Sequence, residues 1–585
     1  MQTLQYKEII KDFPPILDAD MSIGLDLELV GLRENQLHRP SGRLASLAGS
    51  FDGETAYIVF GEDEVAEFLR RIEKSTHIFH NSTFDVGHTR RWAEYPERKN
   101  MRDTLLIERL LWSNYYSDFG LNHLVRRYLG CYMPKDIRKE FHDLEGAMTE
   151  EQIQYAATDV IATWLVDKEQ QKIISLTDSK IWDNLYNPHV WTTLELGGFK
   201  LNVDCWRDLA EKNQEIVDRI STELGTKYGL TKTKLVGRGK NRHEESYFQE
   251  FNPNSHPQVK SILKEKFGLD LESTDDDHIR PYYDTNDFVR NMLDYRKAEK
   301  QVSTYGLPFL KNVEEDERIY TSLNISLAET GRDSSSSPNL QNIPKDKERR
   351  KCFVAGYGKK LVLFDYSGQE ANLWAYISKD SMFKEIINSG KKLYIEVARI
   401  ALGEDIVKGT DRYDIVKGVV LGLMYGLTPY GVARDYGVDI EVAEEMYKKV
   451  LEAFPDTDRY IQDQQSRNRG TVSTIIGRRA HLHPYDRQWM NNTLNSPMQG
   501  SGADMIKLAM KKIRKSEFYQ KYHPEGKLDI ILQVHDEIIT EVDERLAEEW
   551  EPIMKQIMIE VAESLHPGII GGVSGGIITD WSQKD

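Results

Sequence analysis

The segment KLVLFDYSGQE, from Lys360 to Glu370, contains a run of four apolar residues that ends at an acidic residue, Asp365. Such a run predicts a buried central strand, because a strand covered on both faces is apolar along its whole length. A carboxylate at the end of a buried strand either caps a turn or helix or binds a metal ion at the rim of the sheet. Taken alone, this segment leaves both interpretations open.

A second segment, LDIILQVHDEIITEV from Leu528 to Val542, favours the metal-binding interpretation of Asp365. Its two apolar runs meet at His535 and Asp536, which predicts a β-hairpin with Asp536 and Glu537 at its turn. Two buried strands with acids at their ends could hold a pair of divalent cations between Asp365 and Asp536, as two-metal phosphoryl transfer requires. We therefore interpret these acids as catalytic.

The composition is that of a globular protein with several domains. With 585 residues, of which 39% are apolar and 10% aromatic, the chain can fill sizeable cores. The formal net charge of -17 opposes non-specific attraction to polyanions, so a nucleic-acid site must be a local basic cleft in an acidic molecule. Composition thus lowers the expectation of DNA binding without excluding it.

The cysteines and the apolar segments of the chain indicate the cellular compartment in which the protein is expected. Cys131, Cys205 and Cys352 are far apart in the sequence and fit neither a zinc site nor a disulfide framework, so a reducing compartment is expected. The start, MQTLQYKEIIKDF, is too charged for a signal peptide, and the apolar run GVVLGLMYGL is too short to span a bilayer. We predict a cytoplasmic protein.

Three segments of the N-terminal region carry acidic residues. In MSIGLDLELV, alternation places Asp26 and Glu28 on one face of a strand, within reach of one cation. HNSTFD ends at Asp85, and YAATD sets Tyr155 and Asp159 one helical turn apart. The strand acids alone could form an ordinary solvated face, but four acids with a nearby tyrosine suggest two metal ions and an aligned water for phosphodiester hydrolysis.

The order DxE, NxxFD, YxxxD resembles the three motifs of the DEDDy-type 3′→5′ proofreading exonucleases. The resemblance implies a ribonuclease H-like domain in which Tyr155 orients the water. It also implies four metal-binding carboxylates, which are Asp26, Glu28, Asp85 and Asp159. Asp103, which opens DTLLIERLL, resembles another recurrent acid of that fold, and we interpret it as support for the start of a helix.

Two polar segments lie in the middle of the chain. TKTKLVGRGKNRH, from Thr231 to His243, is either a solvated basic loop or a contact to a phosphate backbone. ETGRDSSSSPNLQNIP is rich in hydrogen-bond donors and is stopped by prolines, so we predict a loop built to bind a partner. A serine-rich linker would not explain the spacing of its other polar residues, which are Arg332, Asn339, Gln341 and Asn342.

Five motifs together resemble the family A DNA polymerases of the Klenow type. They occur in the family order with fitting gaps, and they are TGRxSSSxPNLQNIP, the DYS…E segment at Asp365, KGVVLGLMYG at Lys417, NSPMQGSGAD at Asn495 and VHDE at Val534. Each motif is moderately specific alone, and together they make a chance match negligible. The similarity extends from near residue 20 to the end of the chain.

The resemblance implies an α/β multidomain protein, with an exonuclease domain over residues 1–185 and a right-hand polymerase domain over residues 186–585. The thumb is expected at about 186–323, the palm at about 324–381 and 482–585, and the fingers at about 382–481. No segment that could be a 5′-nuclease precedes the exonuclease domain, so that activity is expected to be absent.

KGVVLGLMYG predicts a helix with two stripes. One stripe holds Lys417, Leu421 and Tyr425, and the other holds the glycine that follows each of them. A glycine inside a helix costs about 1 kcal/mol relative to alanine, so something requires a close approach there. Tight helix packing would explain the glycines, and so would a helix that closes on a nucleotide.

The resemblance assigns a role to each residue of the first stripe. It implies that Lys417 contacts the nucleotide's phosphates, Leu421 its sugar and base, and Tyr425 the region of the template base. Glu370 matches the family position whose side chain fills the space of a ribose 2′-OH, with Tyr425 as its hydrogen-bond partner. Residues that match primer and template contacts are Arg332, Asn339, Gln341, Asn342, Asn495, Gln499 and His535.

Several positions depart from the family pattern. The family's phosphate-binding arginine corresponds to Tyr413, and Arg412, one place earlier, could reach the phosphates from the helix start. Tyr394 replaces a nucleotide-binding histidine and keeps a hydrogen bond but no positive charge. Asn372 replaces an arginine, and Leu421 replaces a phenylalanine or tyrosine. Because no metal-binding carboxylate is changed, we expect an active enzyme with altered nucleotide handling.

The resemblance implies template-directed DNA synthesis with 3′→5′ proofreading, with two Mg²⁺ ions at each site and Mn²⁺ as a substitute. Primer-template DNA and dNTPs are the expected partners of a monomer that contacts no membrane. The compact layout suits replication by a phage enzyme in the cytoplasm of a bacterial host, which is an analogy only.

Two alternatives come from other functional classes. A single-subunit RNA polymerase shares the two palm acids and the lysine helix, but Glu370 and the exonuclease motifs argue against it. A nuclease or DNA-binding scaffold with an inactive polymerase half would have lost carboxylates that are present here.

Overall fold

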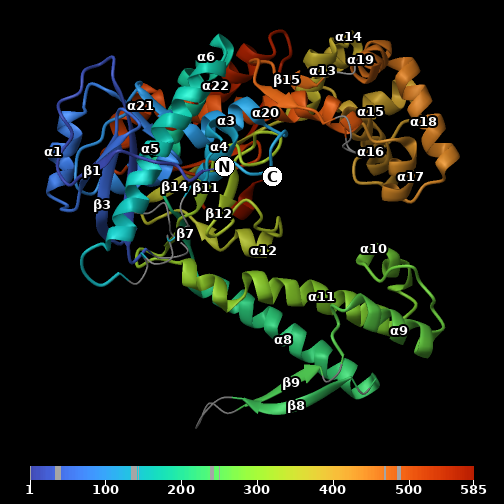
Figure 1. Cartoon of the computed structure of the whole chain (residues 1–585). Helices are drawn as coiled ribbons and strands as arrows, with labels where there is room; N and C mark the ends of the chain where they lie inside the picture. The colour runs from blue at the N-terminus through green and yellow to red at the C-terminus, as the bar shows by residue number, and fades with distance from the viewer. Residues whose placement is uncertain are drawn as a thin grey trace.

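The computed structural model describes residues 2–32, 41–133, 137, 141, 144–228, 230–236, 243–248, 251–466, 470–483 and 489–584. An N-terminal lobe built on a mixed sheet lies beside a smaller palm sheet, and a helical arm and a helical lobe extend from the palm (Figure 1). No helix within these described residues combines the length and the apolar character that crossing a bilayer requires.

A six-stranded sheet forms the centre of the N-terminal lobe, in the order β1-β4-β3-β2-β5-β6. The strands are β1 (Glu8–Ile10), β2 (Ser22–Val30), β3 (Arg43–Ser50), β4 (Thr55–Val59), β5 (Thr76–Phe79) and β6 (Met101–Asp103). The alternation predicted for β2 is confirmed, because its leucines are buried while Asp26 and Glu28 are partly exposed. β2 pairs with β3 from Gly24 to Val30 but with β5 only from Ser22 to Gly24, so at Asp26 and Glu28 the side of β2 that faces β5 has no paired strand.

Several helices accompany this sheet in the N-terminal lobe. They are α1 (Glu64–Arg71), α2 (Ser82–Thr89), α3 (Thr104–Trp112), α4 (Leu121–Leu129), α5 (Glu150–Ile173), α6 (Leu176–Ile181) and α7 (Asn187–Leu194). α5 and α2 both contact β2. Asp103 is the N-cap of α3 and accepts hydrogen bonds from the backbone N–H groups of Leu105 and Leu106, which confirms its predicted role.

The palm is a four-stranded antiparallel sheet in the order β17-β18-β14-β19. Its strands are β14 (Lys359–Tyr366), β17 (Leu528–Val534), β18 (Glu537–Asp543) and β19 (Val573–Ile578). The four apolar residues before Asp365 are almost completely buried, and β17 and β18 form the predicted hairpin around His535 and Asp536. Helices α20 (Trp489–Lys515) and α22 (Ala547–Leu565) pack on this sheet.

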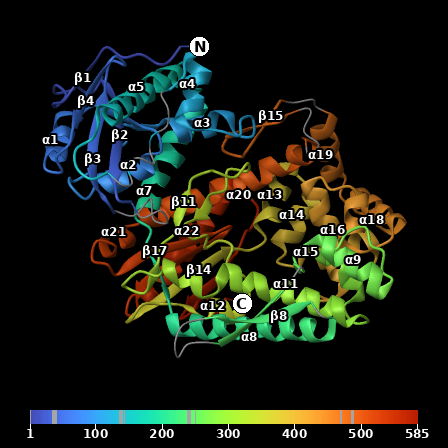
Figure 2. The same ribbon diagram turned by 60° about the horizontal axis from the view of Figure 1, so that its bottom comes forward.

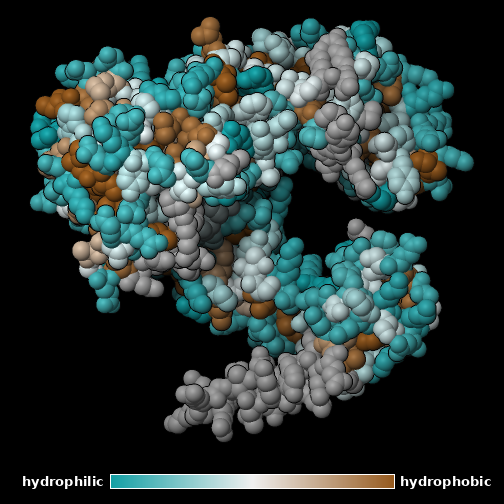
Figure 3. All heavy atoms as spheres, in the orientation of Figure 1, coloured by the Kyte–Doolittle hydropathy of each residue, from teal (hydrophilic) through white to brown (hydrophobic). Residues whose placement is uncertain are grey.

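A long arm is formed by α8 (Val203–Tyr228) and α11 (Asp287–Tyr305), which pack along each other. It carries β8 (Thr231–Val236), β9 (His243–Phe248), α9 (His256–Phe267) and α10 (Asp276–Ile279). In the space-filling view a wide opening separates the far end of this arm from the helical lobe (Figure 3). The assignment of the arm as the thumb and of the lobe as the fingers stays a prediction.

The helical lobe follows the palm strand β14. It contains α13 (Gln369–Ser378), α14 (Ser381–Asn388), α15 (Leu393–Val397), α16 (Asp411–Tyr425), α17 (Pro429–Tyr436), α18 (Ile440–Ala453) and α19 (Pro455–Ser466). Its apolar residues are continuous with the apolar core beneath the palm sheet, which includes Phe364 and Trp550. The predicted border between the first two domains, at residue 185, falls in the helical run from α6 to α7, and the domain limits stay predictions.

Two sequence-based expectations need correction. The segment Thr231–His243 is not simply a loop, since β8 and β9 pair in antiparallel register and residues 237–242 lie outside the described part of the chain. The expectation that the cysteines form no disulfide is wrong for one pair, because Cys205 and Cys352 are joined as a disulfide. The two residues are 147 positions apart in the sequence, and only the fold brings α8 to the segment before the palm.

Candidate active sites

The first cluster of carboxylates lies where β2, α2 and α5 meet. Ligand oxygens of Asp26, Glu28 and Asp159 all lie within 4.8 Å of one another, a spacing at which they could share a metal ion. Asp85 joins the cluster from α2, because its Oδ1 accepts a hydrogen bond of 3.0 Å from the backbone N–H of Leu27. The structure therefore brings the four predicted acids together from three elements.

These acids repel one another in a buried setting. Burial, followed by the charges of its three acidic neighbours, raises the pKa of Glu28 well above its usual range. Burial and the nearby Asp26 raise the pKa of Asp85 in the same way. A divalent cation would relieve this repulsion, and carboxylate oxygens are the ligands that Mg²⁺ prefers. Tyr155 is buried one turn before Asp159 on α5, at the place predicted for it.

The second cluster lies at the ends of two palm strands. Asp365 pairs in register with Glu537, and the backbone N–H of Tyr366 donates a hydrogen bond of 3.2 Å to the carbonyl of Asp536. Burial and the adjacent Asp365 carboxylate raise the pKa of Asp536 to about 7. The structure thus places the two predicted catalytic acids side by side, and their donor atoms also suit a hard cation.

Lys584 is a residue of this site that sequence reasoning missed. Its ammonium group contacts the carboxylates of both Asp365 and Glu537. Glu537 is buried and also accepts a hydrogen bond of 2.8 Å from Nε1 of Trp581. A single lysine with no local motif carries no signal of such a role, because its position depends on the packing of Trp581 beneath the palm.

The predicted helix with two stripes is α16. Lys417 is exposed, and Leu421 and Tyr425 are partly buried along the same side. A Cβ atom on Gly418 would lie 2.3 Å from the ring of Tyr436, and one on Gly422 would lie 2.7 Å from the hydroxyl of Tyr447. Both glycines are therefore explained by tight packing of α16 against α17 and α18.

The third glycine of that stripe has a different role. Gly426 is the C-cap of α16, with φ of 73°, a left-handed conformation that glycine adopts without strain. It ends the helix, so the expectation that it packs inside the helix is wrong.

Glu370 joins the palm loop to the helical lobe. Its carboxylate accepts hydrogen bonds from the hydroxyl of Tyr425, as predicted, and from Nη2 of Arg332 at 3.3 Å. Burial and this hydrogen bond raise the pKa of Tyr425, so its hydroxyl remains a donor at neutral pH. The contact fixes the Glu370 side chain from two directions.

Arg412 is not placed with the exposed stripe of α16. Its guanidinium forms two hydrogen bonds to the carboxylate of Glu404, of 2.7 and 2.5 Å. The ring of Tyr413 instead meets that of Tyr394 edge to face, with 5.8 Å between centroids, and burial raises the pKa of Tyr394 to about 12. Two tyrosines, Tyr394 and Tyr413, therefore lie one helical turn before Lys417, where the family has an arginine.

The predicted DNA-binding residues lie on the loop before the palm, on α20 and at the turn of the palm hairpin. Asn339 and Asn342 are exposed in the loop before the palm, while Asn495 and Gln499 lie four residues apart on α20. Gln341 points inward and donates hydrogen bonds to Gln533 on β17, so it holds the loop to the palm. Burial and the nearby charges of Arg332 and Lys345 lower the pKa of His535.

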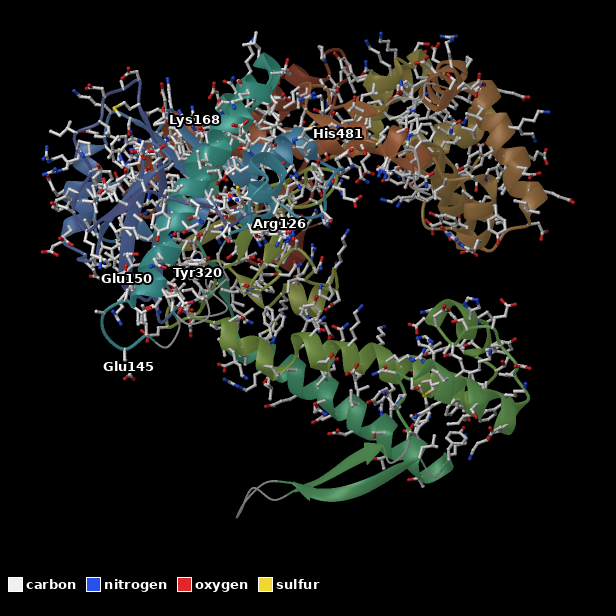
Figure 4. The ribbon with its side chains drawn as sticks, in the orientation of Figure 1. Arg126, Glu145, Glu150, Lys168, Tyr320 and His481 are labelled. Atoms are coloured by element: carbon white, nitrogen blue, oxygen red, sulfur yellow. A yellow bond between two sulfur atoms is a disulfide. The ribbon has the colours of Figure 1, made fainter. Side chains whose placement is uncertain are left out.

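Polar contacts join Arg479 and His481 to the N-terminal lobe. In Figure 4, His481 lies beside the segment that leads from α3 to α4. Its backbone N–H donates to the carbonyl of Ser113 at 2.9 Å, and its Nε2 lies 2.8 Å from the carbonyl of Leu111. Arg479 adds an ion pair with the buried Asp178 at 2.8 Å. The two carboxylate clusters therefore belong to lobes that are packed against each other.

Comparison with known proteins decides the family. A family model described as DNA polymerase family A matches residues 226–581, which is more than half of the chain. The chain belongs to this family. A second model, described as 3′-5′ exonuclease, matches residues 1–174 and so contains the first carboxylate cluster.

Several curated proteins resemble this family A chain. DNA polymerase I of Aquifex aeolicus is 28% identical over 535 residues, which cover 87% of this chain and 88% of the relative. DNA polymerase I of Streptococcus pneumoniae serotype 4 is 29% identical over 434 residues, 69% of this chain and 47% of the relative. A thermostable DNA polymerase I of Thermus filiformis is 31% identical, over 57% of this chain and 42% of the relative. The family A chain thus spans about half the length of most of these relatives.

A solved structure supports the fold over nearly the whole chain. It is the POL domain of Pol1 from M. smegmatis in complex with a DNA primer-template and dNTP. The likeness has a TM-score of 0.80 with 23% identity, and it covers 99% of this chain and 100% of that chain. The predicted fold, an exonuclease domain followed by a right-hand polymerase domain, is confirmed.

Proposed function

We propose that this chain extends a primer on a DNA template from dNTPs and removes misincorporated 3′ ends at a second site. The observation that carries the proposal is the meeting of Asp365 and Asp536 at the ends of paired palm strands, next to a helical lobe that presents Lys417. The separate cluster of Asp26, Glu28 and Asp159 supports the exonuclease activity. Roles in replication or in a phage stay predictions.

Both clusters fit divalent cations, since carboxylate oxygens converge in each, and burial with a neighbouring acid raises the pKa of Glu28 in one and of Asp536 in the other. Asp365 and Asp536 would hold Mg²⁺ at the polymerase site, and the four N-terminal acids would hold it at the exonuclease site. When bound, Mg²⁺ supplies Lewis-acid activation of the attacking oxygen and stabilises the charge on the leaving group.

The protein's own side chains then select and position the substrates. The ammonium group of Lys417 pairs with the phosphates of the incoming nucleotide, and Leu421 packs against its sugar and base. Glu370, held by Tyr425 and Arg332, occupies the space that a 2′-OH would need. At the exonuclease site, Tyr155 orients the attacking water. Charge stabilisation, without a covalent intermediate, provides the rate.

The direct test uses purified protein, a labelled primer on a longer template, and Mg²⁺. Extension with dNTPs but not with rNTPs is expected, and primer shortening is expected when dNTPs are omitted. A chelator should abolish both reactions. Efficient extension with rNTPs would instead support the single-subunit RNA polymerase.

The first prediction concerns sugar choice. Glu370→Ala should open the space beside the 2′-carbon and raise the use of ribonucleotides relative to deoxynucleotides. It should also slow synthesis, because Tyr425 and Arg332 lose their shared partner. The measurement is the ratio of kcat/KM for each rNTP and dNTP pair. Glu385→Ala, which removes an exposed acid from α14, is the control, and an unchanged ratio in Glu370→Ala would reject this role.

The second prediction concerns dideoxynucleotides. A tyrosine at position 421 could offer its hydroxyl in place of the missing 3′-OH, whereas leucine has no donor. The wild type should therefore discriminate against ddNTPs. Leu421→Tyr should raise their relative use several-fold or more, since a hydrogen bond contributes on the order of 1 kcal/mol.

Leu421→Phe controls for the ring without the hydroxyl, and the measurement is the ratio of kcat/KM for ddNTP and dNTP. If all three proteins gave the same ratio, Leu421 would not contact the sugar, and the placing of Lys417 and Tyr425 would have to be revised.

A further inference from the structure

A buried cluster of charged side chains lies behind the loop that carries Arg332. Asp333, His189 and Lys507 have side-chain exposures of 2%, 0% and 2%. Nε2 of His189 lies 2.6 Å from one carboxylate oxygen of Asp333, and Nζ of Lys507 lies 2.9 Å from the other. A buried charge is costly unless it is paired, and here both carboxylate oxygens of Asp333 have partners.

The cluster fixes the backbone on both sides of Arg332. Oδ1 of Asp333 accepts a hydrogen bond of 2.9 Å from the backbone N–H of Ser326, and Lys507 donates one of 2.7 Å to the carbonyl of Gly331. The loop is therefore tied down just before and just after Arg332. Burial alone would raise the pKa of Asp333, but Lys507 and His189 hold it below its usual range, so the carboxylate stays charged.

Arg332 and Asp333 face opposite environments although they are consecutive. Asp333 is turned into the protein, whereas Arg332 is partly exposed and reaches Glu370 with 3.3 Å between Nη2 and Oε1. A shift of the loop would move Arg332 and weaken the support of Glu370. The precision of that contact thus depends on how firmly the loop is held.

The partners of Asp333 come from two elements far apart in the sequence. His189 belongs to α7, which contacts α2 of the exonuclease domain, and Lys507 belongs to α20, which packs on the palm. Figure 2 shows α7 between the exonuclease sheet and the palm elements. The cluster of Asp333, His189 and Lys507 is therefore buried where the loop, α7 and α20 meet.

We propose that Asp333, held by His189 and Lys507, is a positioning residue that fixes Arg332 against Glu370 and so sets both the rate and the sugar selectivity of nucleotide addition. This inference rests on the proposed polymerase function. It assigns a role to three buried residues, Asp333, His189 and Lys507, that belong to neither carboxylate cluster.

The test is a double-mutant cycle between Asp333→Asn and Arg332→Ala. Asp333→Asn keeps the shape of the side chain but removes its charge, and it should lower kcat/KM for dNTPs by about tenfold to a hundredfold, as misplacement of a positioning group does. The same change in the Arg332→Ala background should have less than about a twofold effect, because residues that act through one contact are not additive. Ribonucleotide use relative to deoxynucleotide use should rise in Asp333→Asn.

The matched control is Asp167→Asn, which neutralises an equally buried acid paired with Arg102 in the exonuclease domain and should leave extension unchanged. The rate at which each variant degrades a single-stranded primer shows whether the variant is folded. If Asp333→Asn does not fold, His189→Asn applies the same test while the pair between Asp333 and Lys507 is retained.

Three results would overturn the inference. They are an unchanged kcat/KM in Asp333→Asn, additive effects in the double variant, and an equal loss of primer degradation, which would indicate a general structural role. Failure of the wild type to extend a primer would reject the proposed function instead, so the two failures are distinguishable.

Discussion

Asp536→Ala should reduce primer extension roughly a thousandfold or more, because metal-assisted charge stabilisation contributes several kcal/mol to phosphoryl transfer. Asp365→Ala should have the same effect, since the two acids form one cluster at the ends of β14 and β18. Primer degradation should remain near normal in both variants. The measurement is the single-turnover rate of dNTP addition beside the rate of primer shortening.

Asp543→Ala is the matched control for this prediction. It removes an acid from the other end of β18, where Asp543 pairs with the exposed Arg545. Extension by this variant should match the wild type. Wild-type extension by Asp536→Ala would mean that the catalytic acids of this chain lie elsewhere.

Joint replacement of Asp26 and Glu28 by alanine should abolish primer degradation and leave extension almost unchanged. The expected loss is again roughly a thousandfold, because half of a four-carboxylate site is removed. The measurement is the release of nucleotides from a single-stranded primer. Asp20→Ala, at an exposed position just before β2, should degrade primers normally. A double variant that still trimmed at the original rate would show that the exonuclease site had been misassigned.

The parts of both sites that the sequence predicted are those governed by local periodicity. β2 and β14 follow from the alternation of leucines with acids and from an unbroken apolar run, and α16 follows from its four-residue spacing. Acids at the ends of buried strands converge because paired strands bring their ends together, as Asp365 and Asp536 show. The family motifs then supplied roles that periodicity cannot supply.

The parts that were missed depend on contacts between distant segments. The disulfide joins Cys205 to Cys352, and Lys584 reaches Asp365 only because Trp581 is buried under the palm. Neither contact leaves a local pattern in the sequence. Arg412 is a further case, since its position near the helix start suggested a phosphate contact, which stays a prediction, while its pairing with Glu404 left no pattern in the sequence.

The close packing behind α16 determines how this helix can move. Because the ring of Tyr436 rests against Gly418 and the hydroxyl of Tyr447 against Gly422, the helix has no room to slide or turn against α17 and α18. We therefore expect these helices to move as a group about a hinge outside it and not to slide past one another. Under the proposed function, we expect Lys417 to approach a nucleotide together with all three helices, so that the speed of nucleotide capture is a property of the whole lobe and not of one helix.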